Sequence, residues 1–164
     1  MVNAPEAIAE VVSLNGGKIV GRTRLQKTLY FLEVAHLGYG FDYDYYHYGP
    51  YSEEVATSAR DAEVLQILNV DWRSTADGIE YAVYTAPIVG IEEPESQQKR
   101  AILGKLASVD SITLELAATA NFLERNGFAA DPWAETAIRK PSKATPKRIE
   151  KAKALLADLG SFLV

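Results

Sequence analysis

The dipeptide Asp77-Gly78 restricts the possible folds of this chain more than any other feature, because it separates two β-prone segments. Residues 70–73 and 79–85 contain aromatic and β-branched side chains, and Asp-Gly between such segments is a strong hairpin signal. Most of the remaining chain has apolar residues at helical spacing. The sequence therefore predicts one antiparallel hairpin among several helices.

The elements expected before this hairpin predict a particular arrangement. Residues 5–14, 23–37 and 53–68 have the apolar periodicity of helices, and residues 18–20 suit a short strand. Helix, strand, helix, helix and hairpin is the element order of a winged helix, in which a β-hairpin wing follows a three-helix core.

Only helical patterns follow after Pro87. We therefore predict an α+β, mostly helical fold. In this interpretation, residues 1–90 form a winged-helix-like core, and residues 91–164 form a helical extension that packs on the core as one compact unit.

Three local signals predict where elements begin and turn. Thr23 and Gln26 form the T-x-x-Q pattern of a capping box, so a helix is expected to begin after Thr23. Ser52 is expected to cap the next helix. Gly49-Pro50 is expected to form the turn that ends an extended, tyrosine-rich segment.

The composition excludes several kinds of site. Cysteine is absent from the 164 residues, which rules out disulfides, thiolate metal sites and cysteine nucleophiles. No apolar run approaches the roughly 20 residues needed to span a bilayer, and no charged-then-apolar leader begins the sequence. We expect a cytoplasmic protein that is not attached to a membrane.

The net charge of −5 is unevenly distributed. Residues 1–90 carry six Lys or Arg and twelve Asp or Glu, whereas residues 139–153 carry seven cations and one anion. We call residues 139–153 the basic segment. An acidic first half argues against general affinity for nucleic acid, and the basic segment leaves room for an acidic partner.

Few residues could support catalysis. The two histidines are His36, which lies on the apolar stripe of a helix, and His47, which lies among tyrosines. No zinc-protease, nucleophile-elbow or phosphate-loop motif is present, and the Asp42 and Asp44 pair is a weak pattern for a cation site. We expect no enzyme activity, no catalytic residue, no metal and no cofactor.

A winged helix raises the question of DNA binding. The helix that would enter the DNA groove lies within residues 53–66 and carries four acids and one arginine, so phosphates should be repelled. Contacts to DNA or to an acidic partner would instead come from the basic segment, through Arg139, Lys140, Lys147, Arg148 and Lys151.

Residues 42–52 read DYDYYHYGPYS and hold five of the nine tyrosines. Tyrosine has a rigid apolar ring with a polar tip, which suits protein-binding surfaces. Alternation would send Tyr43, Tyr45 and His47 to one side, and Tyr46 and Tyr48 to the other. One row would then complete the core while the other is exposed. The competing interpretation is that nearly all the rings are core packing.

Two strings resemble a known family. LQKTLYFLE (residues 25–33) and YGPYSEEV (residues 48–55) are similar to the L-Q-K-x-x-Y helix and Y-G-P turn of Panacea-domain proteins. These are the SocA/GepA-like, phage-associated group, and the YwgA-like proteins are related to them. Residues 114–123 and 131–141 resemble the tail of such proteins.

This resemblance implies the antitoxin or regulatory partner of a bacterial or phage toxin–antitoxin pair, which acts by protein contact without a catalytic centre. It also implies that Lys27, Tyr30 and the Y-G-P turn form one structural corner. The residues expected to bind a cognate toxin or regulator are Lys27, Tyr30, Tyr46, His47, Tyr48, Pro50 and Tyr51.

We therefore expect a non-enzymatic protein-interaction module, with homodimerisation left open. One alternative is a winged-helix transcription regulator that binds DNA through the basic segment. A second is a small-molecule sensor whose pocket is the tyrosine and histidine cluster.

Overall fold

The computed structural model describes residues 2–89 and 93–163. The predicted boundary between residues 90 and 91 lies outside the described residues. In chain order, the elements are α1 (Ala4–Leu14), β1 (Lys18–Val20), α2 (Arg22–Val34), β2 (Asp44–Tyr46), β3 (Gly49–Tyr51), α3 (Glu53–Val64), β4 (Asn69–Ser74), β5 (Glu80–Thr85), α4 (Pro94–Ala107), α5 (Ser111–Arg125), α6 (Pro132–Arg139), α7 (Pro146–Asp158) and the 3-10 helix η1 (Gly160–Phe162).

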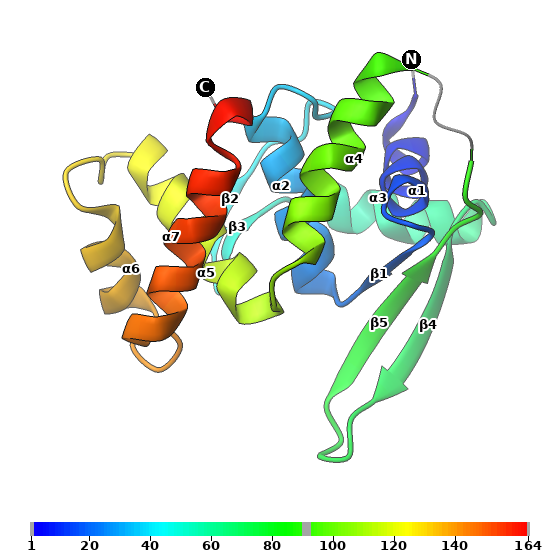
Figure 1. Cartoon of the computed structure of the whole chain (residues 1–164). Coiled ribbons are helices and arrows are strands. Elements are labelled where there is room, and N and C mark those ends of the chain that lie inside the picture. The colour runs from blue at the N-terminus through cyan, green and yellow to red at the C-terminus, as the bar shows by residue number, and fades with distance from the viewer. Residues whose placement is uncertain (1, 90–92, 164) are drawn as a thin grey trace.

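The hairpin predicted at Asp77-Gly78 is present. Strands β4 and β5 pair antiparallel from Asn69 and Thr85 to Ser74 and Glu80, and β1 adds to the other side of β5. Gly78 has a φ of 82°, a conformation that glycine adopts without steric cost. The hairpin projects away from the helices (Figure 1).

The α+β class predicted from the sequence is confirmed, because helices predominate and the sheet is small and antiparallel. The first half of the chain has the expected helices, short strand and final hairpin, but the two-stranded sheet of β2 and β3 lies between α2 and α3, where the expected order has none. The more specific likeness to a winged helix stays a prediction. None of the helices in the described part of the chain combines the length and apolar character that crossing a bilayer requires.

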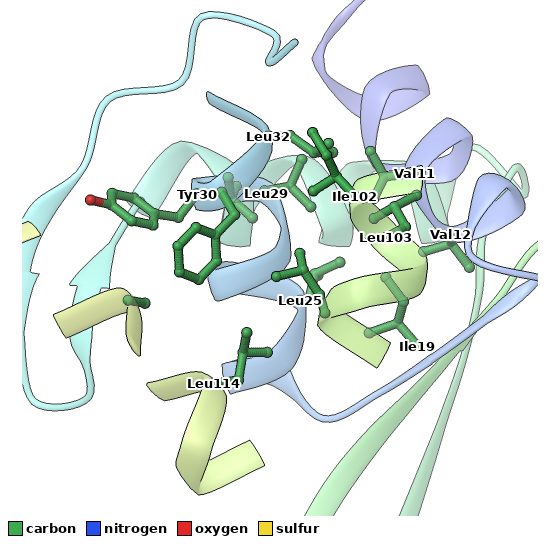
Figure 2. Packing of buried hydrophobic residues seen from close by; sticks show 14 of the residues in the cluster. Val11, Val12, Ile19, Leu25, Leu29, Tyr30, Leu32, Ile102, Leu103 and Leu114 are labelled. Carbon is green, nitrogen blue, oxygen red and sulfur yellow. The ribbon is translucent and has the colours of Figure 1, made fainter. Parts of the chain in front are cut away.

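Helix α2 lies at the centre of the core. Leu25, Leu29 and Leu32 of α2 pack among side chains of α1 and α4, such as Val11 and Ile102 (Figure 2). Buried residues of α5 and α7 belong to the same hydrophobic cluster. The helices that follow β5 therefore share one core with the helices that precede it.

The capping box predicted at Thr23 and Gln26 is wrong. Helix α2 begins at Arg22, and its N-cap, Gly21, makes no side-chain hydrogen bond. The Gln26 amide instead reaches the backbone of Ser52, donating to its carbonyl and accepting from its N–H, both at 2.9 Å. These two buried hydrogen bonds satisfy both the NH2 group and the oxygen of the Gln26 amide, as a buried amide requires.

The turn predicted at Gly49-Pro50 is also wrong. Tyr46 pairs with Gly49 across β2 and β3, so His47 and Tyr48 form the turn, and Gly49-Pro50 begins strand β3. A Cβ atom at Gly49 would collide with the Thr119 side chain of α5, so this glycine allows close packing of β3 on α5. Ser52 caps α3 as predicted, accepting from the Val55 N–H at 3.2 Å.

Candidate partner-binding site

Strands β2 and β3 and their turn, residues 44–51, form a small structure that we call the tyrosine hairpin. Tyr43, just before it, and Tyr45 are half-buried, whereas Tyr46 and Tyr48 are each 55% exposed. His47 is exposed at the turn instead of lying in the inward row as expected. The rings therefore divide between the core and the surface.

Tyr30 anchors the inward side of the hairpin. Its hydroxyl donates to Oδ1 of Asn121 in α5 at 2.6 Å, and its ring meets the Tyr43 ring edge-on at 5.3 Å. Figure 2 shows Tyr30 on the opposite side of α2 from Leu32. Burial raises the pKa of the Tyr30 hydroxyl well above its usual value. Tyr30 is 4% exposed, so in this structure it supports the hairpin and does not offer a surface contact.

Lys27 and Lys140 hold the hairpin backbone, and we call this pair the lysine clamp. Lys27 Nζ donates to the Pro50 carbonyl at 2.8 Å, and Lys140 Nζ donates to the His47 carbonyl at 2.9 Å. Both side chains are buried, Lys27 at 1% and Lys140 at 6% exposure. Of the corner that the family resemblance implied, the structure shows the contact of Lys27 with Pro50, whereas Tyr30 contacts Asn121 and Tyr43.

Glu115 of α5 balances the charge of the clamp. This buried carboxylate lies 2.9 Å from Lys140 Nζ and 2.9 Å from Lys143 Nζ. Burial lowers the pKa of Lys27 to about 7; Lys140 and Lys143 act in the same direction, and Glu115 opposes them. Sequence reasoning missed Glu115, although an acid between Leu114 and Leu116 on an apolar helix was a signal for a buried partner.

The basic segment is used partly inside the molecule. Lys140 was expected to contact DNA or an acidic partner, but its side chain is buried against Glu115 and the His47 carbonyl and is not available. Arg139 pairs with Glu135 at 2.7 Å and lies over the rings of Tyr45 and Phe128. The long apolar stem of a lysine packs along apolar groups, so that its amine can reach a partner inside the protein. The sequence pattern alone placed Lys140 at the surface because it shows the charge and not this partner.

The rest of the segment is more accessible. Arg148 is half-buried and donates to the Lys143 carbonyl at 3.3 Å, whereas Lys147 and Lys151 are exposed. Lys151 borders a wide hollow of about 760 Å³ between α7 and the turn from α4 to α5, together with Asp110 and Asp158. Both charge signs line that hollow.

A cleft of about 440 Å³ opens beside the tyrosine hairpin, and we call it the aromatic cleft. Its walls come from the start of α2, the hairpin, α3 and the sheet. It is lined by Arg22, Thr23, Leu25, Gln26, Lys27, Tyr46, His47, Tyr48, Tyr51, Ala56, Ala59, Arg60, Glu63, Val70, Trp72 and Tyr84. Five of the seven residues expected to bind a partner are among them. Tyr30 and Pro50 do not line it, and both are buried.

The cleft combines rings with guanidinium groups. Tyr46 and Tyr51 are stacked with their centroids 5.2 Å apart, and the Arg22 guanidinium lies 5.4 Å from the centre of the Trp72 ring. Burial raises the pKa of Tyr84 to about 12, so that this hydroxyl stays protonated at the inner wall. Such a cleft can stack against an apolar ring and bind an acid through hydrogen bonds from arginine.

The sequence did not associate Arg22, Arg60 and Trp72 with the tyrosines, because they lie on other elements. Among the residues that the structure describes, no group of three His, Asp or Glu side chains could hold a metal ion.

Comparison with protein-family models found no match, and no curated protein and no solved structure matches the chain. The resemblance to Panacea-domain proteins therefore stays a prediction.

Proposed function

We propose that this chain is a non-enzymatic protein-interaction module of the antitoxin type, which holds a partner protein at the aromatic cleft. One observation carries the proposal. Tyr46 and Tyr48 are more than half exposed beside a cleft, on a hairpin whose backbone carbonyls accept hydrogen bonds from the lysine clamp. The antitoxin assignment rests on the family resemblance alone, and the cleft supports the binding of a partner.

Rigidity favours binding at this surface. Ordering flexible side chains and loops costs free energy on association, and a pre-formed surface avoids part of that cost. Lys27 and Lys140 hold the hairpin carbonyls, and the Gln26 amide holds Ser52 at the end of β3. Exposed aromatic rings on such a frame have the properties of interaction hot spots.

Co-expression with the adjacent open reading frame tests the proposal. Tyr46→Ala combined with Tyr48→Ala should abolish copurification of the partner, while the unfolding midpoint in urea changes little because both rings are exposed. Tyr81→Ala is the matched control, since Tyr81 pairs with Arg73 and so lies on the sheet face opposite Trp72. Equal loss of copurification in the control, or undiminished copurification with the double variant, would contradict the proposal.

The cleft volume also favours a second candidate, a small-molecule sensor. Pockets for small ligands span about 300–1,000 Å³, and the cleft lies within that range. A ligand-dependent rise in melting temperature that Trp72→Ala abolishes, without any copurifying protein, would favour the sensor.

A further inference from the structure

The aromatic cleft is cationic, although the chain as a whole is acidic. Arg22 and Arg60 line it against a single carboxylate, Glu63, whereas the net charge of the chain is −5. Helix α3 carries four acids and one arginine, and that arginine, Arg60, is the cation it contributes to the cleft. The local charge is therefore opposite to that of the surrounding surface.

The two arginines differ in how they can act, and Lys27 does not add to them. Lys27 is 1% exposed and donates to the Pro50 carbonyl, and burial lowers its pKa to about 7, so it contributes little charge and does not reach a ligand. Arg60 has an exposed side chain and only a distant ion pair with Glu53, at 3.9 Å. Arg22 is exposed, and its guanidinium lies over the Trp72 ring. It forms no ion pair with any residue that the structure describes.

The Arg22 contact sets the geometry of recognition. A group that lies against Trp72 also lies beside the Arg22 guanidinium, because the two are 5.4 Å apart. An acid that binds Arg22 must therefore sit next to the apolar group that occupies the cleft. The rings of Tyr46 and Tyr51 also line the cleft and are themselves stacked.

Resting on the proposed function, we infer that the aromatic cleft receives a segment of the partner protein in which an aromatic side chain is adjacent to a carboxylate. The ring packs between Trp72 and the tyrosine hairpin. The carboxylate accepts hydrogen bonds from Arg22, and Arg60 adds attraction from the α3 wall. In a protein segment without modifications the anionic side chain is a carboxylate, which suits hydrogen bonds from a guanidinium group.

Matched peptides test this inference without knowledge of the partner. The probes are acetyl-Gly-Asp-Trp-Asp-Gly-amide, its Lys-Trp-Lys counterpart and its Asp-Ala-Asp counterpart, titrated at millimolar concentration into the ¹⁵N-labelled full chain. The Asp-Trp-Asp peptide should shift the resonances of Arg22, Tyr46 and Trp72, with an affinity about tenfold higher than either counterpart.

Two variants assign the contact. Arg22→Gln should weaken the Asp-Trp-Asp peptide about tenfold and make it resemble the Lys-Trp-Lys peptide, because the charge-assisted pair is lost. Arg100→Gln is the control of equal charge, since Arg100 is exposed on α4 and does not line the cleft. It should leave the affinity unchanged.

Several outcomes would overturn the inference. These are equal binding of the acidic and basic peptides, shifts outside the cleft, and no shift with any peptide. Binding of the neutral N-acetyl-tryptophanamide as tightly as the acidic peptide would show that the cleft does not recognise a carboxylate. If copurification of the partner depends on Tyr46 and Tyr48 but not on Arg22, the proposed function stands and this inference fails.

Discussion

Lys27 shows how much of this site depends on one side chain. Its amine is buried and donates to a backbone carbonyl, while the nearby carboxylate of Glu115 binds Lys140 and Lys143 instead. Burial therefore dominates and lowers the pKa of Lys27 to about 7, from an ordinary value of 10.5. Protonation of this one group is thereby linked to folding.

The direction of that linkage gives a prediction. Between pH 7 and about 9 the unfolded chain keeps a proton on Lys27 that the folded chain has lost, so the free energy of unfolding should rise with pH. The expected slope is about 1.4 kcal/mol per pH unit. Urea unfolding at several pH values measures it. Above this window, Tyr39 and Tyr43, whose pKa values are raised mainly by burial, act in the opposite direction.

Lys27→Met should remove the rise in stability, and Lys147→Met, an exposed control, should keep it. The loss of stability caused by Lys27→Met should be smallest at pH 7 and largest at pH 9. A slope that is the same in both variants would mean that Lys27 stays charged in the folded protein.

Gly49 provides a second prediction. Its φ of 93° suits glycine, and an added Cβ atom would collide with Thr119. Gly49→Ala should therefore lower the free energy of unfolding by at least about 2 kcal/mol in urea titrations. Gly104→Ala is the control, because Gly104 lies in α4 with open space around it, and it should raise stability by about 0.8 kcal/mol. Comparable losses in both variants would contradict this account.

Elements distant in sequence cooperate to display the tyrosines. Strand β3 packs on α2 and on α5, and Lys140, just after α6, reaches the turn of the hairpin. The second half of the chain is therefore part of the site and not only a support for the core.

Lys140→Met tests this dependence. The change leaves Lys143 as the remaining ion-pair partner of Glu115 and removes the donor to the His47 carbonyl, so stability should fall by about 2 kcal/mol. Lys147→Met, an exposed change within the same basic segment, should alter stability by less than about 0.5 kcal/mol. Urea unfolding compares the two, and equal effects would show that Lys140 is not part of a clamp.

Elements governed by local chemistry were predictable from the sequence. The hairpin at Asp77-Gly78 and the Ser52 cap depend on residues a few positions apart. Gln26 and Gly49 were misread because their partners, Ser52 and Thr119, are far away in the sequence and override the local pattern. The candidate site shows the same division between local and distant residues. The tyrosines are close together in the sequence and could be identified there, whereas Trp72 is brought to them only by the fold.

For the whole molecule, the distribution of charge argues against the DNA-binding alternative. The acids of α3 are exposed, and Lys140 is withdrawn from the basic segment into the core. Lys147, Lys151 and Lys153 are left as exposed cations there, and Arg139, also exposed, is already paired with Glu135. A surface with so few available cations should not neutralise enough phosphates to bind duplex DNA.

An electrophoretic shift assay at low salt should therefore show no duplex binding. Binding that decreases steeply with salt, and that Lys147→Gln combined with Lys151→Gln abolishes, would instead favour the transcription-regulator alternative. A duplex of unrelated sequence serves as the control for non-specific attraction.

The lysine clamp also matters for protein engineering. The tyrosine hairpin alone is two three-residue strands. The amines that donate to its carbonyls belong to Lys27 in α2 and to Lys140, which follows α6. Grafting residues 44–51 onto another scaffold would transplant the rings without their frame. A functional graft has to carry Lys27, Glu115 and Lys140 with it, so the smallest portable unit of this surface spans most of the chain.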